Sequence, residues 1–447
     1  MTLSRTVLFF DTHKILIFFV PFFIYLINGR EISSGDPTPT VFVAVNVVKH
    51  GTVFLDDLRE YIPYHNTPYY VSGRMGHIVS NYPVFPGIMA APVYAPFVWM
   101  GLIEPGDGDL VWKYLSKLSG ALYTALSVLV MYLTLKRLTA PEGAMILSSA
   151  YGLGTALWPI AAQSLWQHGP SVFWWTVCLY GLVRAVEAET GRGFTGYAAL
   201  SGLAAGCAVL CRTVNGIGAA GLCCGMTARY GRRAWVFTVP AAALSAALIS
   251  YNVALFNSWK GGDSVLHALH WELDRMVGIS WSTPLSVGLP GQLISPSRGI
   301  FVFSPFLLFA LWGMAEAWRK PGPVWRLIAW SIPIPVLMWV VFGKYIVWWG
   351  GNSHYGPRYQ IETYPFLMLY LAAVWDRLAA RRGLRGIFYV LLAYSLLVQG
   401  IGAFCYPSDW AVSPVDITVD KGRLWDWANN QIWSCARSGI KGFQWSG

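Results

Sequence analysis

Residues 31–40, EISSGDPTPT, place two carboxylates directly after the first long apolar run of the chain. Asp36 stands between Gly35 and Pro37, and a proline restricts the backbone at its own position and at the residue before it. A carboxylate on such a stiff backbone could accept a proton from a hydroxyl group, which makes Asp36 the candidate general base. The pattern is also a helix start signal, and the two functions are compatible. Glu31, the other carboxylate, is a candidate for lining the same site.

Four basic residues at the ends of apolar runs could bind an anion; they are Arg212, Arg298, Lys344 and Arg358. Snorkelling of long side chains toward water would also explain these positions. Arginine, however, presents a fork of donors that suits phosphate. Acidic partners are scarce nearby, apart from Glu362, which follows Arg358 by one helical turn and could pair with it. We therefore expect these four residues to bind a phosphate group.

Polar and aromatic residues accompany these charges in the same connecting segments. Gln167 and His168 lie in SLWQHGPS, where tryptophan is an ordinary interface anchor but glutamine and histidine are not needed for anchoring. Tyr82 and Tyr355 stand in similar segments, NYPVF and SHYGPR. We expect these four residues to line a substrate site.

Two further groups of residues could hold a divalent cation through carboxylates or histidines; they are 56–60 (DDLRE) and 267–274 (HALHWELD). A solvated helix face explains the first group equally well. The histidine spacing in the second group is not specific for a metal. The sequence therefore predicts no cofactor, although a divalent cation stays possible.

The composition shows what kind of scaffold positions these residues. Of 447 residues, 55% are hydrophobic and only 12% are charged, about half the charge of a soluble domain. The net charge of +10 comes from basic residues in short loops between apolar runs, which favours membrane orientation and argues against a nucleic-acid partner. The chain is predicted to be an all-α polytopic membrane protein.

The apolar runs predict about eleven membrane-spanning helices. They are residues 14–29, 112–135, 142–161, 170–185, 195–211, 214–228, 234–256, 300–317, 324–342, 359–375 and 386–405. Residues 82–103 are apolar too, but they contain four prolines. If this stretch lies along the interface instead of crossing, the basic short loops all fall on the side of the N-terminus. We therefore expect 82–103 to be interfacial.

This topology places the N-terminus in the cytoplasm and the C-terminus outside, in the plasma (inner) membrane. Residues 1–405 form the predicted transmembrane module, with large extracytoplasmic loops at about 30–111 and 257–299. Residues 406–447 form a short extracytoplasmic tail. The candidate residues then gather on the extracytoplasmic side, where they can act on substrates of the cell envelope.

The chain resembles the GT-C superfamily of membrane glycosyltransferases, which includes protein O-mannosyltransferases and the aminoarabinose transferase. The similar segments, from about residue 30 to 370, are SGDPTP, GRMGHIVSNYPVFPG, LWQHGP, GLAAGCAVLCRTVN, YNVALFNSW, SPSRGIFVFSPFLL and GPRYQIETYPFLML. The resemblance implies amphipathic helices in the first loop and an essential Asp there, at the position of Asp36. One departure is that residues 164–171 carry no acid, which leaves metal dependence in doubt.

The resemblance implies transfer of a sugar from a polyprenyl-phosphate-linked donor to a glycan, lipid or protein acceptor on the extracytoplasmic face. Asp36 would be the general base, and the basic residues would stabilise the leaving phosphate. Two other functions remain open. A lipid or glycolipid transporter or flippase would need the same amphipathic cavity, although paired halves are not evident. A polysaccharide polymerase or ligase would use a diphosphate-linked substrate.

Overall fold

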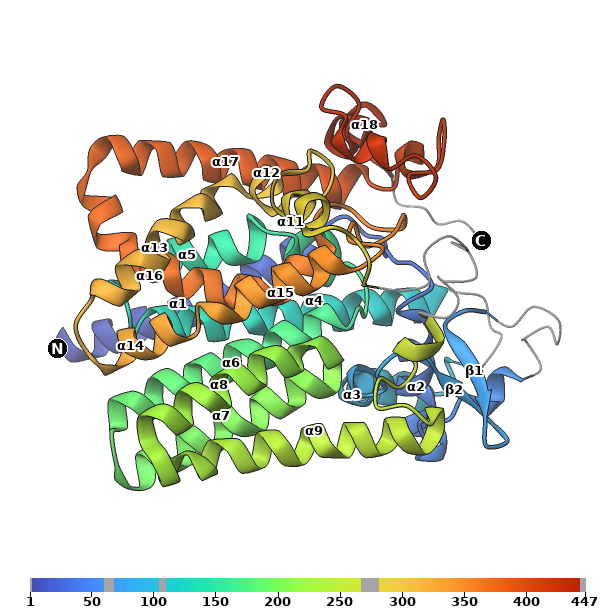
Figure 1. Cartoon of the computed structure of the whole chain (residues 1–447), viewed down its shortest axis with the longest axis horizontal. Helices are drawn as coiled ribbons and strands as arrows, with labels where there is room; N and C mark the ends of the chain where they lie inside the picture. Colours follow the sequence, from blue (N-terminus) through green and yellow to red (C-terminus); the bar gives the residue numbers. More distant parts are fainter. Residues whose placement is uncertain (1, 60–67, 104–109, 267–280, 443–447) are drawn as a thin grey trace.

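Long helices lie side by side along most of the chain (Figure 1), as the apolar runs predict. The computed structural model describes residues 2–59, 68–103, 110–266 and 281–442. The bundle helices are α1 (Thr2–Leu26), α4 (Leu110–Leu135), α5 (Pro141–Leu153), α6 (His168–Ala188), α7 (Gly191–Cys211), α8 (Gly216–Tyr230), α9 (Trp235–Phe256), α13 (Leu308–Arg319), α14 (Pro323–Trp330), α15 (Pro333–Lys344), α16 (Tyr364–Ala380) and α17 (Arg382–Cys405).

Shorter elements gather mostly at one end of the bundle, here called the site end, opposite the N-terminus (Figure 1). They include α2 (Thr38–His50), β1 (Val71–Arg74), β2 (His77–Ser80), α3 (Phe85–Trp99), α11 (Leu285–Ile294), α12 (Ile300–Phe303) and α18 (Gln431–Arg437). Single turns complete the structure: η1 (Asp56–Leu58), η2 (Leu157–Ala161), η3 (Thr213–Asn215), η4 (Gly231–Ala234), η5 (Pro305–Leu307), η6 (Arg358–Thr363), η7 (Asp409–Ala411) and η8 (Lys421–Trp425).

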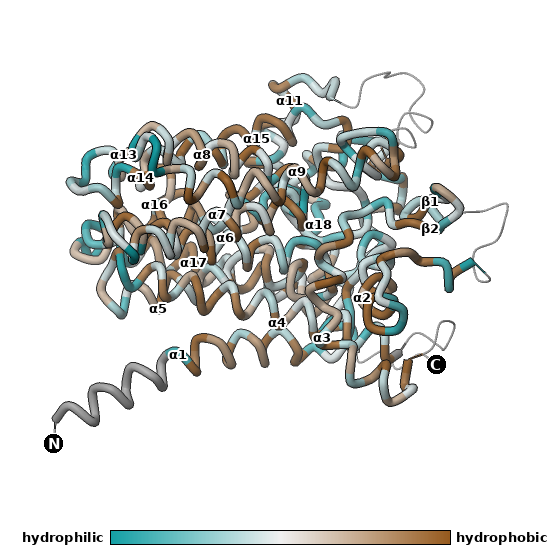
Figure 2. Tube along the Cα trace, turned by 90° about the horizontal axis from the view of Figure 1, so that it is seen from below, coloured by the Kyte–Doolittle hydropathy of each residue, from teal (hydrophilic) through white to brown (hydrophobic). Residues whose placement is uncertain are grey.

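The helical membrane class is confirmed, and each predicted span coincides with one or more helices. Five stretches are long and apolar enough to cross a membrane by length and composition; they are Val111–Leu135, Gly191–Cys211, Thr213–Phe256, Pro323–Lys344 and Arg382–Cys405. Hydrophobic residues run along the helices and hydrophilic ones gather at their ends (Figure 2). Val253 of α9 and Leu397 of α17 are exposed, as expected of side chains that face lipid.

The proline-rich stretch forms α3, which has 15 residues. At 1.5 Å per residue this helix is about 22 Å long, shorter than the ~30 Å hydrocarbon core of a bilayer. It packs against α2 at the site end instead of entering the row of long helices (Figure 1). Its length and position agree with an interfacial helix.

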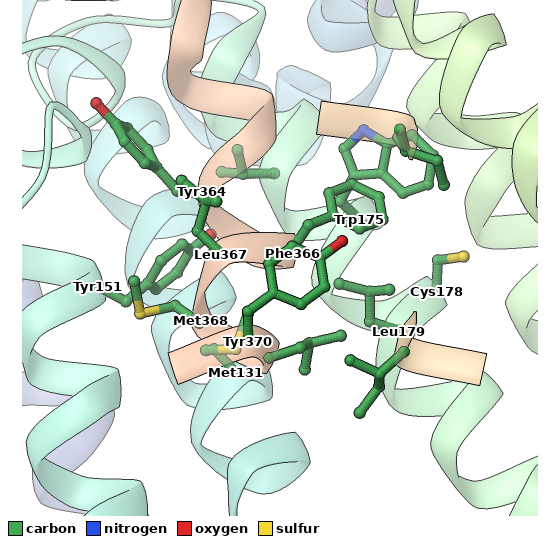
Figure 3. Close-up of a cluster of buried hydrophobic side chains, with 14 of the residues drawn as sticks. Met131, Tyr151, Trp175, Cys178, Leu179, Tyr364, Phe366, Leu367, Met368 and Tyr370 are labelled. Carbon is green, nitrogen blue, oxygen red and sulfur yellow. The ribbon is translucent and has the colours of Figure 1, made fainter. Parts of the chain in front are cut away.

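The centre of the bundle is filled by large aromatic and aliphatic side chains of α4, α5, α6 and α16 (Figure 3). Trp175 of α6 packs against Phe366 of α16 with ring centroids 5.2 Å apart. Trp175 also donates from Nε1 to Asn215 Oδ1 at 2.9 Å, so the polar edge of its ring is satisfied inside the core. This packing fixes α6 and α16, whose N-terminal ends both reach the site end.

Candidate active site

Asp36 lies between α1 and α2 and is held by three donors. Tyr69 Oη donates to its Oδ1 at 2.8 Å and Tyr82 Oη donates to the same atom at 2.7 Å. Arg358 forms an ion pair with Oδ2, and the side chains of Asp36 and Arg358 are each 14% exposed. The helix α2 does begin at Thr38, but no side chain caps it. The carboxylate of Asp36 therefore belongs to this cluster and does not cap α2.

The two tyrosines reach Asp36 because a hairpin brings them together. Strands β1 and β2 pair antiparallel, with Val71 opposite Ser80, so Tyr69 and Tyr82 flank the open end of the hairpin. Gly35 permits the contact, because a Cβ atom at that position would lie 2.5 Å from Tyr69 Oη. A side chain at position 35 would displace the tyrosine.

Arg358 opens η6, directly before α16, and lies among aromatic rings. Its guanidinium carbon stands 4.7 Å from the centroid of Trp166. Trp166 Nε1 in turn donates to the Ile32 carbonyl at 3.3 Å. This hydrogen bond connects Trp166 to the segment that carries Asp36. Cation–π contacts of this kind strengthen when they are shielded from water.

A second acid–arginine pair lies beside the first. Glu362, which is fully buried, accepts from His168 Nδ1 at 2.8 Å and pairs with Arg212. The alternative pairing of Glu362 with Arg358, which one helical turn would allow, is not formed, because Arg358 pairs with Asp36. The two pairs meet through an aromatic wall, since Tyr359 stacks on Phe342 at 4.4 Å and Arg212 lies 5.8 Å from the Phe342 centroid.

The surroundings of Asp36 keep it ionised. Burial alone would raise the pKa of this carboxyl, but the charge of Arg358 and the hydroxyls of Tyr82 and Tyr69 bring its pKa below the ordinary 3.8. Burial and the neighbouring carboxylate raise the pKa of both tyrosines, so they remain protonated donors. The site therefore holds an ionised carboxylate within a shell of donors.

Two of the remaining predicted residues also lie near this cluster. Glu31 accepts from Ser116 Oγ at 2.6 Å and from Ser164 Oγ at 2.7 Å, which anchors the first loop to α4. Lys344 ends α15, beside Tyr345, whose ring centroid lies 6.1 Å from that of Tyr359. It is partly buried and forms no ion pair with a described residue.

The structure does not bring the other predicted residues to Asp36. Gln167 precedes α6 without capping it. Tyr355 Oη donates to the Val398 carbonyl at 2.9 Å inside the bundle. Arg298 is buried and donates to the carbonyls of Ser297, Trp349 and Gly351 and to Gln431. These contacts indicate structural roles for Tyr355 and Arg298.

Three residues of the site end escaped prediction: Tyr69, Trp166 and Asp263. Asp263 accepts from Thr213 Oγ1 at 2.8 Å, next to Arg212. The only sequence signal for it is the glycine pair in KGGDS, which parallels the SGDP around Asp36. Aromatic residues are so common in this chain that Tyr69 and Trp166 carried no signal of their own.

The described residues of the first candidate cation group make local contacts that hold two neighbouring segments together. Asp56 accepts from the Ile78 amide at 2.8 Å and contacts His77 Nδ1 at 2.6 Å, which fastens η1 to β2. Residues 60 and 267–274 lie outside the described residues. Within the described part of the chain, no group of three His, Cys, Asp or Glu residues could hold a metal ion.

Comparison of the sequence with protein-family models and with curated proteins finds no match. Solved structures do match. An oligosaccharyltransferase of Archaeoglobus fulgidus, tethered to an acceptor peptide, aligns over 93% of this chain with 13% identity and a TM-score of 0.53. ArnT of Cupriavidus metallidurans, bound to undecaprenyl phosphate, aligns over 89% with 14% identity and a TM-score of 0.51.

The protein has the GT-C fold. The fold expected from the sequence is thus confirmed, including the helices of the first loop. The chain spans 60% of the length of the oligosaccharyltransferase and 64% of ArnT. At this identity the likeness concerns the GT-C fold alone, and the activity has to be argued from the site.

Proposed function

We propose that this GT-C protein transfers a sugar from a polyprenyl-phosphate-linked donor to an acceptor hydroxyl on the extracytoplasmic face of the plasma membrane. The observation that carries the proposal is the ionised Asp36, held by Arg358 and two tyrosines at the site end. The acceptor is a glycan, a lipid or a protein. The N-terminus is then cytoplasmic, and the loops around Asp36 face outward.

Asp36 acts in this proposal as the general base. The acceptor hydroxyl attacks the anomeric carbon and passes its proton to Asp36, while the bond from that carbon to the phosphate oxygen breaks and the phosphate keeps the electron pair. A base must lie within hydrogen-bond reach of the hydroxyl, and a carboxylate that is ionised in the free protein is ready for this task. Tyr69 and Tyr82 hold its orientation.

The leaving phosphate would be stabilised by Arg358, Arg212 and Lys344. Fixed cations in a site with little water stabilise developing negative charge strongly. A phosphate that draws Arg358 away would also leave Asp36 without its counter-charge and make it more basic. Donor binding would thus switch on the base at the moment when the acceptor hydroxyl has to be deprotonated.

The solved structures support the type of donor, although only by analogy. The ArnT structure contains undecaprenyl phosphate, and the oligosaccharyltransferase structure contains an acceptor peptide. A donor with a single phosphate suits the present site, where Arg358 and the tyrosines already fill the surroundings of Asp36. A diphosphate donor, as a polymerase or ligase would use, brings more charge to the same three cations.

Asp36→Asn tests the proposal. It keeps the shape of the side chain and removes the base, so we expect loss of transfer by at least ~100-fold, the usual scale for a general base. Transfer is measured in detergent with carriers that bear radiolabelled sugar, where a transporter has no activity to show. Asp57→Asn, in the same loop but paired with His50 at 2.9 Å, is the matched control.

Full activity of a folded Asp36→Asn protein would refute the role of Asp36. Absence of any transfer by the wild-type protein, together with flux of the carrier across vesicles, would instead favour the flippase. Thermal unfolding of each variant shows whether lost activity is lost folding.

A further inference from the structure

Two cysteines lie where the C-terminal tail meets the bundle: Cys405 ends α17, and Cys435 lies in α18. Helix α18 packs against the C-terminal end of α17 (Figure 1). It has only seven residues, too few for a helix that is stable by itself, so it depends on its contacts with the rest of the chain. The general-base role of Asp36 makes no use of either cysteine.

The backbones of the two cysteines are bound to the same hydroxyl group. Ser438 Oγ lies 3.2 Å from the Cys405 carbonyl oxygen and 2.8 Å from the Cys435 carbonyl oxygen, and it donates to both. The Lys441 amide also donates to the Phe404 carbonyl at 2.9 Å. The turn that follows α18 is therefore fastened to the last turn of α17, with one serine side chain between the two cysteines.

The two cysteine side chains belong to one buried cluster, which also contains Tyr355 and Tyr406. Both are almost wholly buried. Cys435 Sγ lies 3.4 Å from Ser408 Oγ, a residue three positions after Cys405. The side chains are thus gathered in the same place as the backbones.

One guanidinium group lies beside both thiols. Arg30 donates to the carbonyls of residues 404 and 406, on either side of Cys405. Burial lowers the pKa of Arg30, and the charges of Cys405 and Cys435 oppose this effect. Both cysteines are therefore close to the same cation as well as to the same hydroxyl.

Buried cysteines are often ordinary core residues, and position separates this pair from the rest. All seven cysteines are among the described residues, and the other five lie in α6, α7 and α8 of the bundle. Cys405 and Cys435 lie instead at the tail, which the proposed function places outside the cytoplasm. Disulfides form and persist in such oxidising compartments.

We propose that Cys405 and Cys435 form a disulfide that fastens α18 to the end of α17. Both are free thiols in the structure, so the bond requires an oxidant, here a disulfide-bearing thiol oxidant of the extracytoplasmic compartment. One cysteine thiolate attacks a sulfur of the oxidant's disulfide and releases one of its thiols. The other thiolate then attacks the mixed disulfide, so that the cysteines are joined and the oxidant leaves as a dithiol with two electrons and two protons.

Burial determines when this bond can form. It raises the pKa of the Cys435 thiol to about 11, against a hydrogen bond with Ser408, and the nearby Cys405 adds to the rise. Such a thiol is a poor nucleophile, because the thiolate is the reactive form. The bond therefore forms while the tail is folding and is shielded from reductants once α18 is in place.

The test uses the full-length protein, purified without reductant and denatured in excess N-ethylmaleimide so that every free thiol is alkylated. Trypsin then gives peptide 386–421, which contains Cys405, and peptide 424–437, which contains Cys435. We expect mass spectrometry to find these two peptides joined, to find the other five of the seven cysteines alkylated, and to find the peptides separate after reduction.

Cys435→Ser and Cys405→Ser each leave one cysteine of the pair without a partner. All six remaining cysteines should then be alkylated before reduction, and the joined peptides should be lost. The matched control is Cys224→Ser, which removes an exposed cysteine of α8. In this control the two peptides stay joined.

Alkylation of all seven wild-type cysteines would overturn the proposal, as would a bond from either peptide to a third cysteine. The inference rests on the outward placement of the tail in the proposed function, and sugar transfer by the same preparation keeps the two apart. Transfer by a protein with seven free thiols would overturn the disulfide alone. Joined peptides in a protein that transfers no sugar would support the disulfide and count against the proposed function.

Discussion

Three donors hold the negative charge of Asp36, and each can be removed singly. Burial works against the charge, whereas Arg358, Tyr82 and Tyr69 lower the pKa of Asp36 below its ordinary 3.8. A carboxyl whose pKa is lowered by folding contributes stability above its unfolded pKa and loses it as the pH falls through the folded value. Activity that needs the carboxylate should follow the same direction.

Tyr82→Phe tests whether activity depends on the Asp36 carboxylate in this way, because it removes one of the three donors to that carboxylate. Loss of one donor to the charged form raises the pKa of Asp36, so the acidic limb of kcat/KM moves to higher pH. The loss of activity is therefore larger at pH 5 than at pH 7.5. The pH profile of transfer measures it, and Tyr70→Phe in the same hairpin, whose hydroxyl does not reach Asp36, is the control. Superimposable acidic limbs in wild type and Tyr82→Phe would contradict the prediction.

The sequence could supply the candidates at this scale but not their partners. Asp36 stands out through its glycine and proline neighbours, and basic residues are few enough to be chosen by position. The pairing of Asp36 with Arg358 joins residues 322 positions apart, whereas the sequence offered Glu362 only as a possible local partner of Arg358. Only the tertiary packing at the site end decides between these partners.

At the scale of elements, the segment between α1 and α2 depends on one close approach. In Gly35→Ala the new methyl group would collide with Tyr69 Oη and push the tyrosine off Asp36. A hydrogen bond to a charged group contributes about 1.5–3 kcal/mol, so we expect kcat/KM to fall roughly 10- to 100-fold. Transfer assays at pH 7 measure this, with thermal unfolding measured in parallel.

Gly73→Ala is the control for that variant, since nothing lies within 4 Å of a Cβ atom at position 73. Adding Tyr69→Phe to Gly35→Ala removes the atom that is struck first. The double variant should then be no less active than Tyr69→Phe alone. Additive losses from the two changes would show that Gly35 acts in some other way.

The sequence predicted the helices where a segment crosses lipid. A chain in lipid has to satisfy its backbone within helices, so each apolar run became helix. Prolines divided some runs: α12 and α13 are separated at Pro305, and α15 begins anew at Pro333. The four-residue strands of the hairpin were not predicted, because so short a pattern has no periodicity to recognise.

At the scale of the whole molecule, the C-terminal tail packs on the bundle close to the segment that leads to Arg358. Residues 406–442 pack on the segment before Arg358, with Trp410, Ile417 and Leu424 buried against Trp348 and Trp349. The order of the sequence motifs was enough to indicate the fold, since it spans most of the chain. It could not indicate these contacts of the tail, because they join segments with no common pattern.

Gln431 in α18 connects the tail to the segment before Arg358, and a substitution can test this connection. Its Oε1 accepts from Arg298 and from the Gly356 amide at 2.9 Å, and its Nε2 donates to the His354 carbonyl at 2.8 Å. Gly356 precedes Arg358 by two residues. Gln431→Ala leaves the Gly356 amide and the His354 carbonyl without this partner, at a cost of about 1–3 kcal/mol, and loosens the segment that aims Arg358. We expect a lower Tm and a higher KM for the sugar-bearing carrier.

Asn430→Ala separates stability from positioning. Asn430 caps α18 through the Trp433 amide at 3.1 Å, and its loss costs about 1 kcal/mol without touching the segment before Arg358. Both variants should therefore lower Tm, but only Gln431→Ala should raise the donor KM. If the two raise KM equally for equal losses of Tm, the tail stabilises the fold and does not aim Arg358. A selective rise for Gln431→Ala would make the tail a positioning element for Arg358.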